Sequence, residues 1–122
     1  MIQIVNFNWL SKEASEAEVH LSDGEFRLTC FSHPFKIEKV ENSSFRLYAL
    51  NTQHIYKVEN ERKFFIEKGE DPYNYIIIGK VLDNLKGFLK IGEFIIELDT
   101  PIPSDVDTNS YISFYCDRID IL

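Results

Sequence analysis

The sequence predicts a small all-β protein, and three observations lead to that class. Short runs of alternating apolar and polar residues recur along the 122-residue chain, with turn-forming residues between them. The clearest two runs, 16–22 and 25–32, flank Asp23-Gly24, and Asp-Gly between alternating runs is the strongest short hairpin signal. Roughly seven or eight such segments with regular turns are typical of a barrel or a sandwich.

The first hairpin has a defined apolar face. Val19 and Leu21 alternate with polar residues in its first strand, and Leu28 and Cys30 share one side of its second strand with Phe26. Because successive side chains of a strand point to opposite faces, these residues are expected to form the buried side of the pair.

The other elements are read in the same way. A short helix is expected near Leu10 to Ala17, where Ser11 can cap its first turn. Gly79 is expected to mark a bulge or tight bend inside a central strand. The remaining strands are expected at FKIEKV (35–40) and FRLYALN (45–51), which form a second hairpin, and at HIYKVE (54–59), KFFIE (63–67), YIIIGKVLD (75–83), FLKI (88–91), FIIELD (94–99) and YISFYCDRIDIL (111–122).

The segments EVHLSDGEFRLTCF (18–31) and IIIGKVLD…GEFIIELD (76–99) carry a resemblance to a known architecture. A long early hairpin, an irregular stretch after the third strand and a hairpin before the final strand resemble OB-like small β-barrel proteins. The resemblance implies one antiparallel barrel domain over residues 1–122 with at most one short helix. A small β-sandwich is the alternative.

Composition excludes several classes. A hydrophobic fraction of 44% with ten phenylalanines favours a folded chain, and a net charge of −7 argues against a general nucleic-acid binder. No apolar run approaches the roughly 20 residues that a membrane-spanning helix needs. The start MIQIVNFNWLSKE has no signal-peptide pattern, and two cysteines give no disulfide framework. The expected location is the cytoplasm.

Catalytic and metal-binding motifs are not found. Cys30 and His33 form a C-x-x-H pair before Pro34, but a structural zinc site needs a second pair and Cys116 stands alone. This segment is therefore interpreted as a strand that runs into a turn, with a buried, inert Cys30. Asp105 starts no calcium loop, because the sixth and twelfth positions are not Gly and Glu. No phosphate-binding glycine motif occurs, so we predict no enzyme activity, no cofactor and no metal.

The negative charge is concentrated at the end of the chain. Residues 93–122 contain seven acids against Arg118 alone, a net of −6, whereas residues 1–92 contain 13 acids and 12 bases, a net of −1. In the segment GEFIIELD, Ile95 shares one strand face with acids if Phe94 and Ile96 face the core. An exposed isoleucine among acids suits a contact residue within a charged rim.

The predicted function is therefore a non-catalytic protein-binding module that docks a basic protein through this acidic face. Immunity and inhibitor proteins, which are small, acidic and single-domain, are the compositional analogy. The alternative is an OB-type module that binds single-stranded oligonucleotides through Phe31, Tyr48 and the neighbouring Arg27 and Arg46. The predicted partner-binding residues are Glu93, Ile95, Glu97, Asp99, Asp105, Asp107, Asp117 and Asp120.

Overall fold

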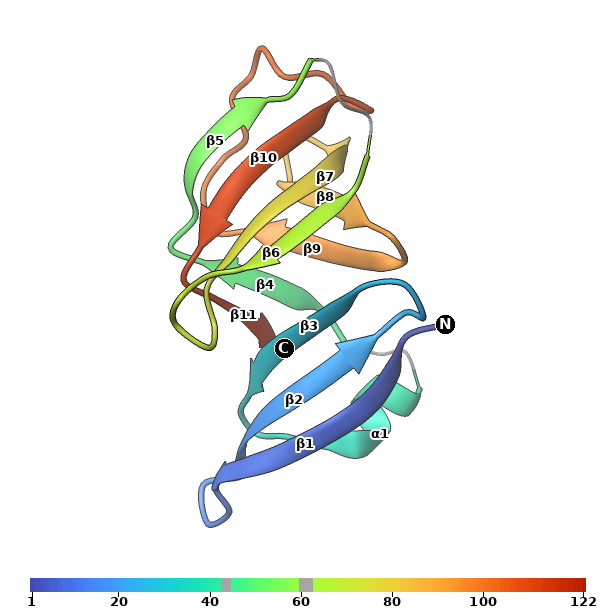
Figure 1. Cartoon of the computed structure of the whole chain (residues 1–122), viewed down its shortest axis with the longest axis vertical. Helices are drawn as coiled ribbons and strands as arrows, with labels where there is room; N and C mark the ends of the chain where they lie inside the picture. Colours follow the sequence, from blue (N-terminus) through green and yellow to red (C-terminus); the bar gives the residue numbers. More distant parts are fainter. Residues whose placement is uncertain (43–44, 60–62) are drawn as a thin grey trace.

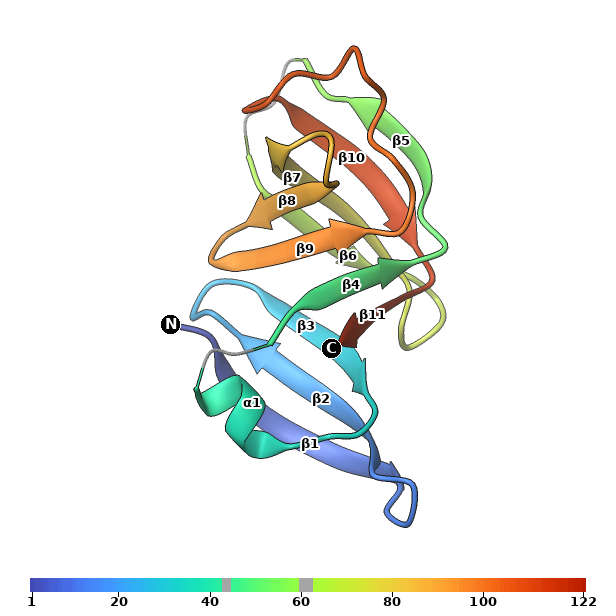
Figure 2. The same ribbon diagram turned by 180° about the vertical axis from the view of Figure 1, so that it is seen from behind.

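The computed structural model describes residues 1–42, 45–59 and 63–122, and these residues form strands with one short helix (Figures 1 and 2). The predicted all-β class is confirmed. The helix is α1 (Ile37–Glu41), and the strands are β1 (Gln3–Ser11), β2 (Glu16–Ser22), β3 (Arg27–Ser32), β4 (Leu47–Leu50), β5 (Gln53–Lys57), β6 (Phe65–Lys68), β7 (Tyr75–Asp83), β8 (Phe88–Ile91), β9 (Phe94–Leu98), β10 (Tyr111–Cys116) and β11 (Arg118–Ile121).

The strands belong to one sheet that is not closed. Its order is β1-β2-β3-β11-β4-β9-β8-β7-β10-β5, and β6 pairs with β7 beside this path. Neighbouring strands are antiparallel except in the β3–β11 and β4–β9 pairs, which are parallel. Whether the strands are best described as a barrel or a sandwich stays a prediction.

The first three strands and the helix form what we call the N-terminal part, residues 1–42. Its β2–β3 hairpin is confirmed, with Ser22 opposite Arg27 and Val19 opposite Cys30. The apolar face of these strands is buried, with Leu21 and Leu28 at its centre. Figure 2 shows α1 lying against this face, and its Val40 is buried there. The opposite face of β2 and β3 includes His20, Arg27, Thr29 and Phe31.

The remaining strands from β4 to β10 form the C-terminal part, and β11 connects the two parts. β10 and β11 are interrupted only at Asp117, and β4 and β5 only at Asn51 and Thr52. β10 pairs with β5 and β7, whereas β11 lies between β3 and β4 (Figure 1). Hydrogen bonding of β11 on both edges thus makes the two parts one sheet.

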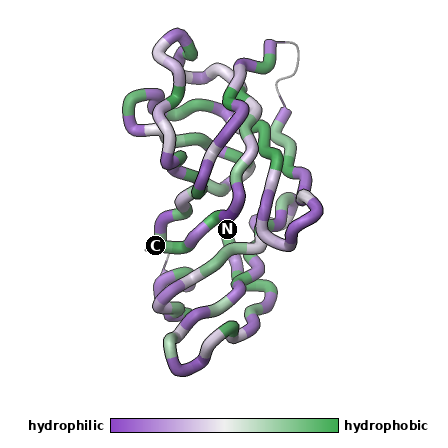
Figure 3. Tube along the Cα trace, turned by 90° about the vertical axis from the view of Figure 1, so that its left-hand side faces the viewer, coloured by the Kyte–Doolittle hydropathy of each residue, from purple (hydrophilic) through white to green (hydrophobic). Residues whose placement is uncertain are grey.

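The core of the C-terminal part follows the predicted alternation. Ile112, Phe114 and Cys116 are fully buried on one face of β10, as predicted, and hydrophobic and hydrophilic residues alternate along the strands in Figure 3. Gly79 allows close contact between β7 and β8, because a Cβ there would lie 2.9 Å from Ile91 Cγ1. The register irregularity occurs beyond Val81 and not at Gly79.

Two local predictions are wrong. No helix forms at Leu10–Ala17: β1 continues to Ser11, whose Oγ accepts a hydrogen bond from the Ala14 N–H within a turn. Conversely, the segment FKIEKV (35–40) forms no strand, and α1 begins within it at Ile37 and ends at Glu41. After Phe35 and Ile37, the next apolar residue is Val40, three positions on, which is the spacing of a helix face and not of a strand.

Two expected pairings also differ from the structure. The strand within FRLYALN is β4, which pairs with β9 and β11 and forms no hairpin with the preceding segment. The strand within KFFIE is β6, which pairs with β7 and not with β5. The β8–β9 hairpin around Gly92 is confirmed.

Candidate functional site

Strand β9 presents one large apolar side chain outward. Phe94 and Ile96 are fully buried and Leu98 nearly so, whereas Ile95 between them is 53% exposed. This is the alternation that the sequence predicted. Ile95 faces away from the core beside Lys90 of β8, its partner in the ladder.

Ile95 borders a hollow that continues onto the N-terminal part. The hollow has a volume of about 330 Å³, and its described lining consists of Met1, Ile2, Phe45, Glu93 and Ile95. We call it the Ile95 hollow. A second hollow of about 340 Å³ shares Met1 and Ile2 and extends past Ile4, Val40 and Glu41. In both hollows the described ionisable side chains are carboxylates, and Met1, whose ammonium group pairs with Glu93, lines both.

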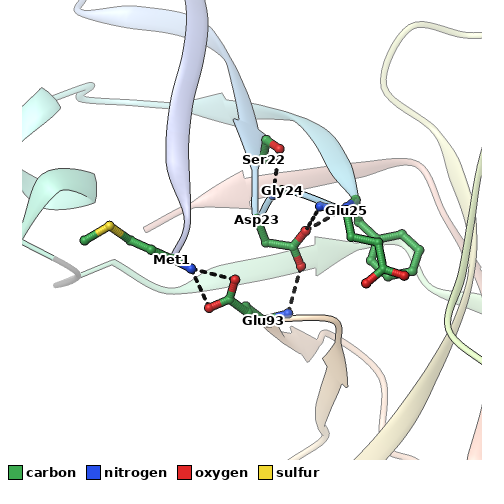
Figure 4. A network of polar contacts seen from close by, with 7 residues as sticks. Met1, Ser22, Asp23, Gly24, Glu25 and Glu93 are labelled. Carbon is green, nitrogen blue, oxygen red and sulfur yellow. Dashed lines mark hydrogen bonds and ion pairs between the residues drawn. The ribbon is translucent and has the colours of Figure 1, made fainter.

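A contact between two turns positions the Ile95 hollow (Figure 4). The Asp23 carboxylate accepts hydrogen bonds from the Glu25 and Phe26 N–H groups within the β2–β3 turn, and from the Glu93 N–H at 2.9 Å across the gap. Gly92 has φ +58, and a Cβ there would lie 2.2 Å from Asp23 Oδ2. The absence of a side chain therefore lets the β8–β9 turn approach the carboxylate.

The electrostatics of Asp23 follow from this contact. Partial burial opposes its ionisation, but the hydrogen bonds from the Glu93, Phe26 and Glu25 backbones outweigh that effect and lower the pKa of Asp23. The Glu93 carboxylate points the other way and contacts the Met1 ammonium at 2.5 Å. Asp23 is thus a structural residue, and Glu93 is exposed at the rim of the hollow.

Two further predicted acids lie in one row of the sheet beside Ile95. Glu97 follows it on the same face of β9, and the register places Tyr48 next to Glu97 and Asp120 next to Tyr48. Each acid has a basic partner: Arg46 contacts Glu97, and Arg118 contacts Asp120 at 2.7 Å. Both carboxylates are half-buried. The structure therefore brings Glu93, Ile95, Glu97 and Asp120 onto a connected surface.

Asp99 and Asp117 have internal roles. Asp99 accepts hydrogen bonds from the backbones of Asn51 and Thr52 and from the Thr52 and Thr100 hydroxyls. Desolvation raises the pKa of Asp99, but these hydrogen bonds prevail and lower it. At Asp117, hydrogen bonds first from Asn51 and then from Tyr115 lower the pKa. Together the two acids hold the corner between β4 and β5.

Asp105 and Asp107 lie away from the Ile95 hollow. They are exposed on the loop between β9 and β10, on either side of the buried Val106. Asp107 lines a different hollow, together with Lys57 and Tyr111. In the described residues neither carboxylate has a hydrogen-bond or ion-pair partner.

On the face predicted for the alternative oligonucleotide-binding function, several aromatic and basic side chains contact other residues of the protein. The Arg118 guanidinium lies 4.3 Å from the centre of the Phe31 ring. Arg46 contacts Glu97, and Tyr48 is half-buried between β11 and β9. Arg27 is exposed and has no acidic partner in the part of the chain described.

The two cysteines are buried, as predicted. Desolvation strongly raises the pKa of the Cys30 thiol and raises that of Cys116 to about 12, so neither forms a reactive thiolate. His33 lies in an exposed turn. Within residues 1–42, 45–59 and 63–122 no group of three His, Cys, Asp or Glu side chains is arranged to hold a metal ion.

A cleft between the two parts was not predicted. It has a volume of about 430 Å³ and is lined by Val5, Asn6, His20, Arg27, Leu28, Thr29, Ile66, Lys68 and Tyr75. No sequence pattern indicated it, because its walls come from two groups of strands, β1–β3 and β6–β7, that are far apart along the chain. We call it the interpart cleft.

No protein-family model, curated protein or solved structure matches this chain. The described helix α1 has five residues, and no helix in the described ranges is long and apolar enough to span a membrane.

Proposed function

We infer that this chain is a non-catalytic protein-binding module of the immunity or inhibitor type, acting in the cytoplasm on a basic protein. The observation that carries the proposal is Ile95, which is half exposed at the edge of an apolar hollow while its neighbours on β9 are buried. A water-exposed apolar side chain in a depression, surrounded by charge, has the anatomy of an interface hot spot.

The chemistry of the partner follows from the rim. Glu93 lines the Ile95 hollow, Glu41 lines the adjoining hollow, and residues 93–122 have a net charge of −6. A complementary segment has one aliphatic or aromatic side chain that enters the hollow, with lysines or arginines on either side of it. The acids set the association rate and the specificity, and the apolar contact sets the lifetime of the complex.

The site is smaller than the one predicted from sequence. Glu93, Ile95, Glu97 and Asp120 remain in the proposed interface. Asp99 and Asp117 stabilise the β4–β5 corner, and Asp105 and Asp107 lie away from the hollow. These four acids would therefore act on the partner by long-range electrostatic attraction and would not contact it directly.

The OB-like barrel was predicted for residues 1–122, and we now propose it for the C-terminal part alone. Its support is the path β4-β9-β8-β7-β10-β5, which begins and ends on strands that are consecutive in the chain. A corner of two residues, Asn51 and Thr52, separates them. On this proposal β4 and β5, the first and last strands of the path, are held near each other by the Asn51-Thr52 connection and not by hydrogen bonds between the two strands.

The test compares three versions of the protein as affinity baits in extracts: wild type, Ile95→Asp and the control Leu85→Asp. Leu85 is 92% exposed in the turn between β7 and β8, so the control adds the same charge away from the hollow. We expect a basic protein to bind wild type and Leu85→Asp and to be lost from Ile95→Asp. The reconstituted pair should then associate more slowly as salt increases.

Two results contradict the proposal. One is equal capture by all three baits, which would place any interface elsewhere. The other is saturable binding of a single-stranded oligonucleotide that is weakened by Arg27→Gln and unaffected by Ile95→Asp, which would favour the oligonucleotide-binding function.

A further inference from the structure

The interpart cleft differs from the rest of the molecule in the sign of its charge. The chain has 20 acids against 13 lysines and arginines. Even so, the described lining of the cleft contains Arg27 and Lys68 and no carboxylate. Both cations are exposed, and neither has a hydrogen-bond or ion-pair partner in the described residues. Two uncompensated cations that line one cleft attract an anion.

The two cations come from opposite walls. Arg27 begins β3 in the N-terminal part, and Lys68 ends β6 in the C-terminal part. Figure 1 shows the loop after β6 descending beside β11 and β3. Tyr73 of this loop donates a hydrogen bond to Glu18 of β2 at 2.9 Å, so the two walls are fixed relative to each other. The cleft is therefore preformed.

The floor of the cleft is a polar row that crosses the first three strands. Asn6 lies opposite His20, and His20 lies opposite Thr29. Both nitrogens of His20 are engaged: Nδ1 lies 3.1 Å from Thr29 Oγ1, and Nε2 lies 2.9 Å from Glu18 Oε1. His20 and Thr29 thus stabilise the floor, and the Asn6 amide remains as a donor on it.

Tyr75 adds a buried donor at the back of the cleft. Only 3% of the residue is exposed, and its hydroxyl oxygen accepts a hydrogen bond of 2.7 Å from the Thr29 N–H. Desolvation is the main reason that the pKa of Tyr75 is raised, so the phenol stays protonated at neutral pH. The Thr29 side chain also forms a hydrogen bond with this phenol. An oxyanion at this point would accept the phenol proton directly.

We propose that the interpart cleft binds a small organic dianion, held between Arg27 and Lys68 and hydrogen-bonded by Tyr75. Its volume is within the range of small-molecule sites, about 300–1,000 Å³. Val5 and Ile66 provide an aliphatic wall for the carbon skeleton of the ligand. Its described lining has no aromatic ring besides Tyr75 to stack on a base, which favours a short phosphate ester or dicarboxylate over a nucleotide. The site is independent of the Ile95 hollow.

The experiment is a titration of the ¹⁵N-labelled full chain, followed by amide chemical shifts. The probes are glycerol 3-phosphate and succinate, and the controls are glycerol and sodium chloride at matched ionic strength. We expect saturable shifts centred on Arg27, Thr29, Lys68 and Tyr75 with at least one dianion, and none with glycerol. Comparison of the two probes decides between a phosphate ester and a dicarboxylate.

Three single variants identify the binding groups. Arg27→Gln and Lys68→Gln each remove one charge-assisted contact and should weaken binding about tenfold. Lys86→Gln removes the same charge from the exposed β7–β8 turn and should change affinity less than about twofold, because exposed distant charges are screened. All three positions are exposed, so the variants are expected to fold, and their amide spectra verify it.

Three outcomes overturn the proposal: no saturable shift with either dianion in the millimolar range, shifts centred away from the cleft, or equal weakening by Lys86→Gln. Displacement of bound dianion by an acidic peptide that binds far more tightly would also overturn it, because the cleft would then be a protein-binding site.

Discussion

The N-terminal part meets the C-terminal part in two places that are built differently. At one place the β2–β3 turn contacts the β8–β9 turn at Gly92. There the Asp23 carboxylate accepts a hydrogen bond from the Glu93 N–H. At the other, Tyr73 and Tyr75 reach Glu18 and Thr29 and the interpart cleft remains beside them.

The difference shows how one interface can be tight in one place and open in another. A glycine lets two backbones approach until a short carboxylate connects them, which leaves no room for a ligand. Two long tyrosine side chains connect the same parts at a greater distance and leave space between the walls. We name these the turn contact and the tyrosine contact, and the predictions below test how they differ.

The largest effect is expected from Gly92→Val at the turn contact. Valine is strained at φ +58, and its Cβ would overlap Asp23 Oδ2 and lie 2.9 Å from the Phe26 ring. We expect the free energy of unfolding to fall by about 3 kcal/mol or more, measured by urea denaturation. Gly24→Val is the control: its φ is +98, but a Cβ there meets no atom within 4 Å, so only backbone strain of about 1–3 kcal/mol remains. Equal decreases in the free energy of unfolding of the two variants would show that the close approach at Gly92 does not contribute to stability.

Asp23→Ala should have the next largest effect. It leaves the N–H groups of Glu25, Phe26 and Glu93 without their acceptor, and we expect a loss of about 2 kcal/mol in urea denaturation. Asp105→Ala removes an exposed loop carboxylate and should change the stability by less than about 0.5 kcal/mol. If both substitutions are neutral, water replaces the carboxylate and the turn contact does not hold the parts together.

A smaller loss is expected at the tyrosine contact. Tyr75→Phe removes the acceptor of the buried Thr29 N–H and should cost about 1–2 kcal/mol. Tyr73→Phe removes a half-buried hydrogen bond to Glu18 and should cost less than about 1 kcal/mol. The two melting temperatures, measured by circular dichroism, test this order. A Tyr73→Phe protein less stable than Tyr75→Phe would reverse the assigned roles.

The smallest effect is a dependence of stability on acidic pH. The pKa values of Asp23 and Asp99 are lower in the folded chain than the ordinary 3.8, so their ionised forms favour folding. Their contribution is complete above pH 3.8 and is lost as the pH falls through the folded-state values. Urea denaturation at several pH values below about 5 should show this decline, and Asp23→Asn should make it shallower. An unchanged slope in Asp23→Asn would mean that this carboxylate does not titrate differently in the two states.

Predictions from the sequence were accurate where the apolar alternation of a strand matches the burial of its two faces in the structure. The alternation in β2, β3, β9 and β10 identified their buried faces and the exposure of Ile95. The signal failed where the pattern was ambiguous, as at Phe35 to Val40, which reads as a strand for its first residues and forms a helix against β1–β3. It also failed for β1, whose Gln3–Ser11 run is mostly exposed and lacks a clear alternation.

The candidate site was recovered only in part. Charge counting located the acidic segment, but it treated Glu93, Asp99, Asp105 and Asp117 as equivalent. Their roles differ because their partners differ: Asn51 and Thr52 donate to Asp99, Asn51 and Tyr115 donate to Asp117, and Asp105 has no partner among the described residues. No pattern along one strand reveals such a partner.

By itself, the sequence determined the all-β class, the β2–β3 and β8–β9 hairpins and the inward faces of their strands, because these depend on neighbours two residues apart and on turn residues. Only the tertiary structure decided the sheet order, the place of β11 between the two parts, the Ile95 hollow and the interpart cleft. Each of these requires residues separated by tens of positions to meet, as Asp23 meets Glu93 and Thr29 meets Tyr75. Such contacts depend on how the strands pair and pack, and local periodicity contains no information about which strands become neighbours.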